Sequence, residues 1–192
     1  MREQVIERIE KEKLIAIVRG VSADQCSKVA NALYAGGVRL MEITYNQKDP
    51  ASWQQTAEAI GALTEEFGGK MLFGAGTVTN VELVELTHAH GGKYIISPDT
   101  NVDVIKRTVE LGMVSLPGAM TPTEVMTAHD AGADFVKLFP ADCVDLKYIK
   151  AVRAPINHIP LLAVSGVTPE NLGDYLKAGM AGAGIGSILV TK

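Results

Sequence analysis

Two ionisable side chains interrupt apolar segments of this sequence. Lys137 lies inside FVKLF at residues 135–139, and Glu42 lies inside LMEIT at residues 40–44. Both segments have the pattern of buried strands, and a charged group rarely enters such a strand without a partner or a chemical role. Side chains alternate between the two faces of a strand, so both residues face one interior if their strands form one barrel.

An amine and a carboxylate in one apolar interior can carry out carbonyl chemistry. Desolvation would lower the pKa of Lys137 from about 10.4 by several units, and a neutral amine is the form that attacks a carbonyl. Glu42 could then move protons as the resulting imine becomes an enamine. The alternative is a buried ion pair between the two residues that helps to hold the barrel together. The residues alone leave both interpretations open.

The composition indicates a globular protein of ordinary domain size. The chain has 192 residues, of which 47% are hydrophobic and 21% charged, and this size suits one domain over residues 1–192. The net charge of −4 argues against nucleic-acid binding, which requires a basic face. No apolar run approaches the roughly 18 residues that cross a membrane, and the charged N-terminus lacks a signal-peptide core. We therefore expect a cytoplasmic protein with no nucleic-acid or membrane partner.

The cysteines and histidines do not predict a metal site. Cys26 and Cys143 fit neither a disulfide framework nor a zinc-binding spacing. His88 and His90 are two positions apart, so on a helix they point in different directions. Ordinary surface histidines explain this pattern better than metal ligands, and we predict no bound metal.

Eight short apolar segments alternate with amphipathic segments along the chain. Several amphipathic segments begin with Ser, Asp, Asn or Thr, and most end in Gly, as capped helices do. Strands that alternate with helices indicate a parallel sheet, and eight of them predict an α/β protein, a (β/α)8 TIM barrel. An extra N-terminal helix is predicted over residues 2–12, and the last helix, after the eighth strand, is absent from the given chain. The predicted strands cover residues 14–18, 40–44, 71–75, 94–97, 113–117, 135–139, 161–165 and 183–187.

Glycine-containing turns follow the last two predicted strands. Residues 164–167 read VSGV before the capped segment TPEN, and residues 184–187 read GIGS. The chemistry of such barrels lies at the C-terminal strand ends, and the turns after the last two strands commonly bind phosphate. The alternative is that glycine serves only to make tight turns. Two adjacent turns of this kind favour a phosphorylated ligand.

The ordered motifs EIT, GAGTV, SPDTN, PGAMTPTE, VKLFPA and GIGS resemble those of the 2-keto-3-deoxy-6-phosphogluconate (KDPG) and 4-hydroxy-2-oxoglutarate aldolases. This family includes 2-keto-3-deoxy-6-phosphogalactonate aldolases, and the resemblance runs from about residue 2 to residue 192. It implies a (β/α)8 barrel, typically a homotrimer, that works through a covalent lysine imine without a metal or another cofactor. The implied reaction cleaves KDPG reversibly to pyruvate and glyceraldehyde 3-phosphate. A further implied substrate is 4-hydroxy-2-oxoglutarate, which gives pyruvate and glyoxylate.

The resemblance also implies roles for individual residues. Lys137 matches the Schiff-base lysine, and Glu42 matches the general acid and base. Thr77 matches the residue that binds the pyruvate carboxylate, while Pro98 and Phe139 match residues that shape the pocket near the ketone. The residues that match the phosphate-binding turns are Gly166, Gly184 and Ser187, and Ser165 beside them can offer its amide and hydroxyl as donors.

Three positions depart from the pattern of many KDPG aldolases: Asn46, Val164 and Ser165, the last standing where a glycine is common. Asn46, which we include among the substrate-binding residues, stands where some relatives have an arginine that contacts the carboxylate. We expect Arg19, at the end of the first strand, to supply that charge; the alternative is that it contacts Glu42 or a backbone carbonyl. Val164 stands where a threonine is common and cannot hydrogen-bond a substrate hydroxyl. The sequence therefore does not decide which C4 epimer is the preferred substrate, and 2-keto-3-deoxy-6-phosphogalactonate is the main alternative to KDPG.

Two other functions compete with the aldolase. An epimerase or a thiamine-phosphate-synthase-like barrel would need metal ligands or a diphosphate site, and no His/Asp set stands at several strand ends. A non-catalytic barrel that binds sugar phosphates would be favoured by loss of Lys137 or Glu42, and both residues are present. The sequence therefore favours the aldolase.

Overall fold

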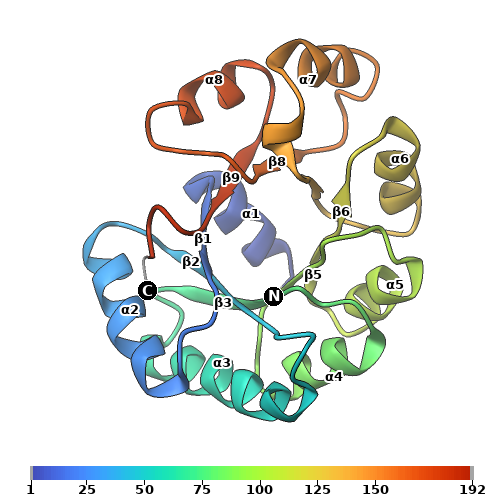
Figure 1. Ribbon diagram of the computed structural model, residues 1–192. Helices are drawn as coiled ribbons and strands as arrows, with labels where there is room; N and C mark the ends of the chain where they lie inside the picture. The colour runs from blue at the N-terminus through green and yellow to red at the C-terminus, as the bar shows by residue number, and fades with distance from the viewer. Residues whose placement is uncertain (1, 191–192) are drawn as a thin grey trace.

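Parallel strands form the wall of a nearly closed barrel in the computed structural model, which describes residues 2–190 (Figure 1). Within those residues there are nine strands, in the order β5-β4-β3-β2-β1-β9-β8-β7-β6 around the wall. Because each paired strand runs parallel to its neighbour, the chain must cross over between consecutive strands, and helices supply these crossovers. The strands are β1 Leu14–Val18, β2 Leu40–Thr44, β3 Leu72–Gly76, β4 Tyr94–Ile96, β5 Val114–Leu116, β6 Gly118–Ala119, β7 Val136–Leu138, β8 Leu161–Val164 and β9 Gly182–Ile185.

Helices cover the outside of the barrel, as Figure 1 shows for α2 to α8. Four of them begin at a side chain that accepts a hydrogen bond from a first-turn amide, as helix caps do; these residues are Asn80, Asn101, Thr121 and Asp145. The helices are α1 Arg2–Glu12, α2 Ala23–Ala35, α3 Trp53–Phe67, α4 Val81–Ala89, α5 Val102–Glu110, α6 Pro122–Asp130, α7 Leu146–Arg153 and α8 Leu172–Lys177, with short 3-10 helices at η1 Pro50–Ser52 and η2 Ala141–Cys143. None of the helices within residues 2–190 combines the length and apolar character needed to cross a membrane.

The predicted (β/α)8 barrel is confirmed, with one difference at its fifth strand. The segment predicted at 113–117 ends as β5 at Leu116, and a second short strand, β6, follows Pro117. Proline has no amide hydrogen and cannot continue a ladder, which explains the interruption. The interruption lies where the wall closes, because Lys137 donates its amide to Pro117 O at 2.8 Å and Asp134 donates to Ser115 O at 3.1 Å.

The N-terminal helix α1 closes the floor of the barrel. Val5 and Ile9 of α1 are buried in one apolar cluster with Leu40 of β2, Tyr94 of β4 and Phe135 directly before β7. An ion pair of 2.8 Å between Arg2 and Asp134 joins this helix to the segment before β7. The floor is therefore apolar and filled, and the polar residues of the interior lie toward the opposite end.

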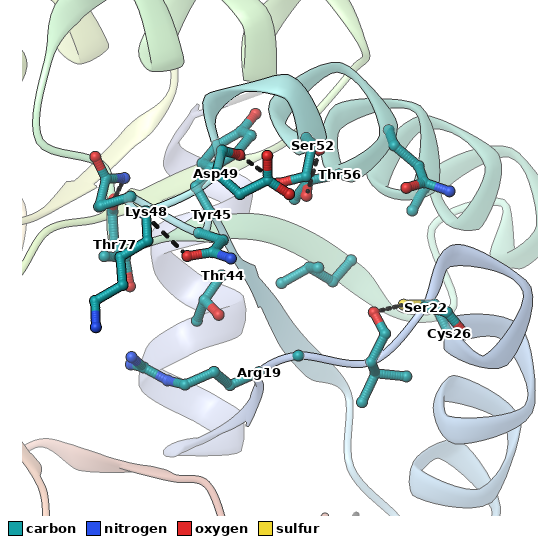
Figure 2. A pocket seen from close by; sticks show the side chains of 17 residues that line it. Arg19, Ser22, Cys26, Thr44, Tyr45, Lys48, Asp49, Ser52, Thr56 and Thr77 are labelled. Carbon is teal, nitrogen blue, oxygen red and sulfur yellow. Dashed lines mark hydrogen bonds between the residues drawn. The ribbon is translucent and has the colours of Figure 1, made fainter.

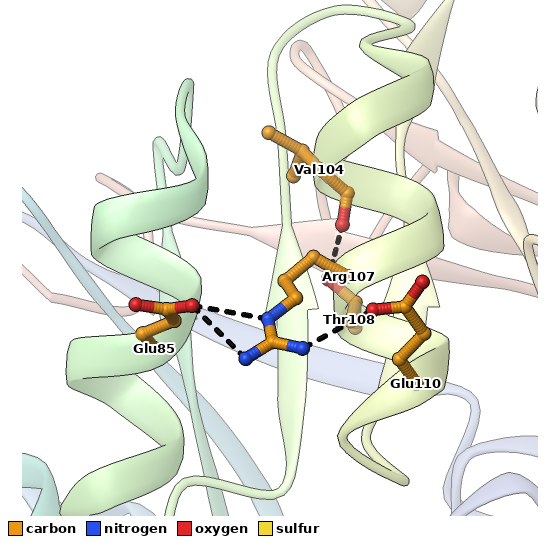
Figure 3. A network of polar contacts seen from close by, with 5 residues as sticks. All are labelled: Glu85, Val104, Arg107, Thr108 and Glu110. Atoms are coloured by element: carbon orange, nitrogen blue, oxygen red, sulfur yellow. Dashed lines mark hydrogen bonds and ion pairs between the residues drawn. The ribbon is translucent and has the colours of Figure 1, made fainter.

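The outer helices are also joined to one another at the surface. Figure 3 shows Arg107 of α5 reaching the facing helix α4, where it pairs with Glu85 at 3.0 Å. The same guanidinium pairs with Glu110, one turn farther along α5, at 3.1 Å. These groups are well exposed, so water and salt screen them and we assign them a supporting role only.

The chain beyond β9 forms a turn in the described residues. Residues 186–190 contain no helix, as the sequence predicts, and Leu189 and Val190 pack partly against the core. The last two positions of the GIGS motif, Gly186 and Ser187, therefore lie directly after the strand at the open end of the barrel.

Candidate active site

Lys137 extends from β7 into the barrel interior, as strand alternation predicts. Its side chain is buried, with 8% of its surface exposed, and its Nζ atom lies 4.7 Å from the centre of the Phe139 ring. Desolvation lowers the pKa of Lys137 below its ordinary value; Arg19 lowers it further, whereas Glu42 and Asp99 partly offset the shift. The environment therefore favours the neutral amine, which is the nucleophilic form.

Glu42 extends from β2 into the same interior and is 3% exposed. The neighbouring strand β3 gives it room because glycine stands at 76, where a Cβ atom would lie 2.3 Å from Glu42 Oε1. Burial raises the pKa of Glu42 from 4.5 to about 7, although Lys137 and Arg19 oppose this shift. A carboxyl group with a pKa near 7 can both accept and return a proton at neutral pH.

The two ionisable groups line one small internal cavity together with apolar residues such as Leu116 and Leu162. This confirms the prediction that an amine and a carboxylate share the barrel interior. Within residues 2–190 they form no ion pair with each other, so the interpretation of a purely structural salt bridge loses its main support.

Above this interior, a cavity of about 600 Å³ opens between the ends of β8 and β9. The four residues predicted to bind phosphate, Ser165, Gly166, Gly184 and Ser187, all line it, together with Arg19, Phe139 and Val164. Gly166 has a φ of 67° and no room for a side chain, because a Cβ there would lie 2.3 Å from that of Asp142. The turn therefore requires glycine for its close packing as well as for its backbone shape.

A second cavity, of about 630 Å³, opens on the other side of Arg19, between the end of β2 and the start of α3. Arg19 lines both cavities, and no ion pair or hydrogen bond occupies its guanidinium within residues 2–190. Figure 2 shows that guanidinium and the Lys48 amine on the same side of this cavity as Thr77. The predicted carboxylate-binding residues Arg19, Asn46 and Thr77 thus share one cavity wall.

Two predicted site residues have left-handed backbones, which are unusual for side chains other than glycine. Thr77 has a φ of 59° and Ser165 has a φ of 85°. Such conformations cost about 1–3 kcal/mol each and gather at functional sites, where surrounding contacts hold them. In Ser165's turn, Asn171 Nδ2 donates to Gly166 O at 2.9 Å. Contacts around the two turns therefore hold backbone conformations that are energetically unfavourable for Thr77 and Ser165.

The remaining predicted residue, Pro98, lines neither cavity. The Pro98 carbonyl oxygen lies so close to Gly118 of β6 that a Cβ atom on Gly118 would be 2.4 Å from this oxygen. The sequence reasoning also missed residues that hold the site from outside, namely Gln47, Asp142 and Asn171. Only Asn171 had a signal, as the last residue of the TPEN motif. Residues 2–190 contain no group of three or more His, Cys, Asp or Glu side chains placed to hold a metal ion.

The fold and the site together define the class: a parallel β/α barrel whose chemistry lies at the C-terminal strand ends. A model of the family described as KDPG and KHG aldolase matches residues 5–192. The 2-dehydro-3-deoxy-6-phosphogalactonate aldolase of Escherichia coli K12 is 41% identical over 180 residues, which cover 93% of this chain and 85% of that protein. The chain therefore belongs to the KDPG and KHG aldolase family, and it is an aldolase, a carbon–carbon lyase.

Solved structures agree with this assignment. A native KDPGal structure is 40% identical, with a TM-score of 0.83 over 91% of this chain and 82% of that one. The KDPG aldolase of Legionella pneumophila, solved with pyruvate captured at low pH as a covalent carbinolamine intermediate, shares the fold at 23% identity. Its TM-score is 0.83 over 94% of this chain and 85% of that one.

The raised pKa of Glu42 predicts a pH dependence of stability that Glu42→Gln should remove. Between pH 4.5 and about 7 the folded protein keeps a proton on Glu42 that the unfolded chain releases. The free energy of unfolding of the wild type should therefore fall, relative to that of Glu42→Gln, as the pH rises through this window. Urea unfolding of both proteins at several pH values measures the difference, and parallel profiles would contradict the raised pKa.

Proposed function

We propose that this protein is a class I aldolase that cleaves a 2-keto-3-deoxy-6-phosphosugar acid to pyruvate and glyceraldehyde 3-phosphate. The observation that carries the proposal is the pairing of a buried lysine of lowered pKa with a buried carboxyl of raised pKa in one cavity. Environments that push two titratable groups toward neutral pH are typical of acid–base sites.

The mechanism follows from these two groups. Neutral Lys137 Nζ attacks the C2 carbonyl carbon. The carbinolamine hydroxyl then takes a proton from protonated Glu42 and leaves as water, which gives an iminium and ionised Glu42. Ionised Glu42, directly or through a water, takes the proton of the C4 hydroxyl, and the C3–C4 bond breaks with its electrons moving into the iminium. The aldehyde leaves, and Glu42 returns the proton to C3 of the enamine. Water then adds to the iminium, Glu42 takes up the proton released, and pyruvate leaves neutral Lys137. The iminium is the electron sink, so the proposal includes no metal or other cofactor.

The two cavities suit the two charged ends of such a substrate. We assign the carboxylate to Arg19 and Thr77, because a guanidinium and a hydroxyl both pair well with a carboxylate. Asn46 lines the same wall and can donate from its side-chain amide. We assign the phosphate to the Ser165–Gly166 and Gly184–Ser187 turns, whose small residues leave backbone amides accessible. Lys137 lies in the interior below, where the C2 ketone would be placed.

For the C4 configuration we propose the galactonate epimer as the preferred substrate. Val164 lines the interior cavity with Lys137 and also the phosphate-side cavity, so it lies where the substrate chain would pass C4. Its side chain offers no hydrogen bond to a hydroxyl there. The 41% identity to the E. coli galactonate-type aldolase supports the same choice. KDPG and 4-hydroxy-2-oxoglutarate are the alternative substrates.

The homotrimer and the cytoplasmic location predicted from the sequence rest on the family resemblance and the composition. We retain both as predictions that accompany the aldolase proposal.

A cleavage assay on both C4 epimers tests the proposed reaction. Lactate dehydrogenase is the coupling enzyme that reports the release of pyruvate. The wild type should cleave the galactonate epimer faster, and Lys137→Met should lower the cleavage rate by at least about a thousandfold because the nucleophile is lost. Lys147→Met is the matched control, since Lys147 is an exposed residue of α7. Folded wild-type protein that binds these sugar phosphates without cleaving either epimer would favour the non-catalytic binding protein.

Val164→Thr should shift the preference between epimers toward KDPG. The new hydroxyl can hydrogen-bond the C4 hydroxyl, and one neutral hydrogen bond is worth up to about tenfold in rate. The ratio of kcat/KM for the two epimers measures this shift. Val164→Ala, which changes the volume without adding a donor, should leave the ratio unchanged. Equal ratios of kcat/KM in the wild type and Val164→Thr would contradict the claim that residue 164 lies beside the C4 hydroxyl.

A further inference from the structure

The Gln47 side chain connects the loop after β2 to the loop after β3. Its Nε2 atom donates to Thr77 O at 2.8 Å, and its Oε1 atom accepts from Thr79 Oγ1 at 2.9 Å. Both ends of one amide are therefore used, and both partners lie on the turn that carries the proposed carboxylate-binding residue. Gln47 is exposed and contributes little to the core.

The contacts around Thr77 show what this amide controls. Gly76 O accepts from Tyr45 N at 2.9 Å, and Val78 N donates to Ile96 O at 3.2 Å, so the backbone is held on both sides of Thr77. Between these fixed points Thr77 has a left-handed φ of 59°, which a β-branched residue rarely adopts. The Thr77 carbonyl accepts from Gln47, so Gln47 and Ile96 together hold the two ends of the Thr77–Val78 peptide.

Gln47 is itself presented by a well-held loop. Asn46 Oδ1 accepts from Lys48 N at 3.0 Å, and Asn46 O accepts from Trp53 Nε1 at 3.0 Å. These bonds fix the backbone on either side of Gln47. The Gln47 side chain is therefore held in one position although it is exposed. The Thr77 hydroxyl, by contrast, makes no hydrogen bond within residues 2–190, and Thr77 lines the cavity beside Arg19.

We propose that Gln47 is a positioning residue that holds the strained Thr77 turn in the geometry needed to bind the pyruvate carboxylate. The proposal rests on the aldolase function and on the carboxylate assignment given above. Gln47 acts through Thr77 and does not touch the reacting atoms. Its effect should therefore appear in the affinity for the keto acid and not in the bond-breaking step.

The condensation of pyruvate with glyceraldehyde 3-phosphate separates these effects. Gln47→Met, which keeps the side-chain length and removes both hydrogen bonds, should raise the KM for pyruvate about threefold to tenfold. The kcat and the KM for the aldehyde should stay within about twofold, because the lost contact serves the carboxylate equally in the ground and transition states. The melting temperature should match that of the wild type, since the side chain is exposed.

Two further variants distinguish positioning from a general structural role. Gln54→Met is the matched control, because the exposed Gln54 side chain hydrogen-bonds Glu58 on its own helix α3 and His90 at the end of α4, and not the Thr77 turn. Its KM for pyruvate should equal that of the wild type. Thr79→Val removes only the hydroxyl that orients Gln47 and should raise the KM for pyruvate by a smaller factor. The double variant Gln47→Met/Thr79→Val should be no worse than Gln47→Met alone, because both act through one contact.

Each outcome decides the proposal. An unchanged KM for pyruvate in Gln47→Met, with active wild type, would overturn the positioning role and leave the aldolase function standing. Parallel losses in kcat, in both KM values and in melting temperature would show a structural role and also overturn it. A wild type without condensation activity would overturn the aldolase function, and the positioning role with it.

Discussion

The desolvation of one ammonium group is the constraint on which this structure depends. Lys137 sits where water is largely excluded, and this burial lowers its pKa. The apolar floor built by α1 and the inward faces of the strands excludes water from below. Glu42 shares the same interior, and its pKa is raised by the same loss of water. Burial is thus the main cause of both pKa shifts, in the proposed nucleophile and in the proposed proton carrier, and the barrel around them maintains it.

The polar end of the barrel is organised by backbone shape more than by charge. The turns at Thr77 and Ser165 both contain a left-handed backbone, which residues other than glycine seldom adopt. At each turn a side-chain amide donates to a backbone carbonyl: Gln47, from the loop after β2, to Thr77 O, and Asn171, from the connection that also contains Ser165, to Gly166 O. Arg19 lies between the two cavities. The same device therefore appears at the two proposed ends of the substrate.

The alternation of apolar and polar residues was enough to predict the barrel and its buried pair. Both β1 and β2 have the predicted bounds, and Lys137 and Glu42 face one interior because a strand's side chains alternate. The break at Pro117 was missed, since its effect depends on how the wall closes in space. Gln47 was missed because its partners are set by two loops whose geometry no local pattern specifies. The individual roles came from the family resemblance and stay predictions.

Borohydride reduction in the presence of pyruvate tests the central claim most directly. The account predicts a reduced pyruvate adduct on the intact protein, located by peptide mass spectrometry on Lys137 alone among the lysines. Such an adduct requires a neutral amine that reaches the ketone, and burial lowers the pKa of Lys137 in the direction of that form. Folded protein that gives no adduct on Lys137, while a known Schiff-base aldolase is labelled under the same conditions, would contradict the account.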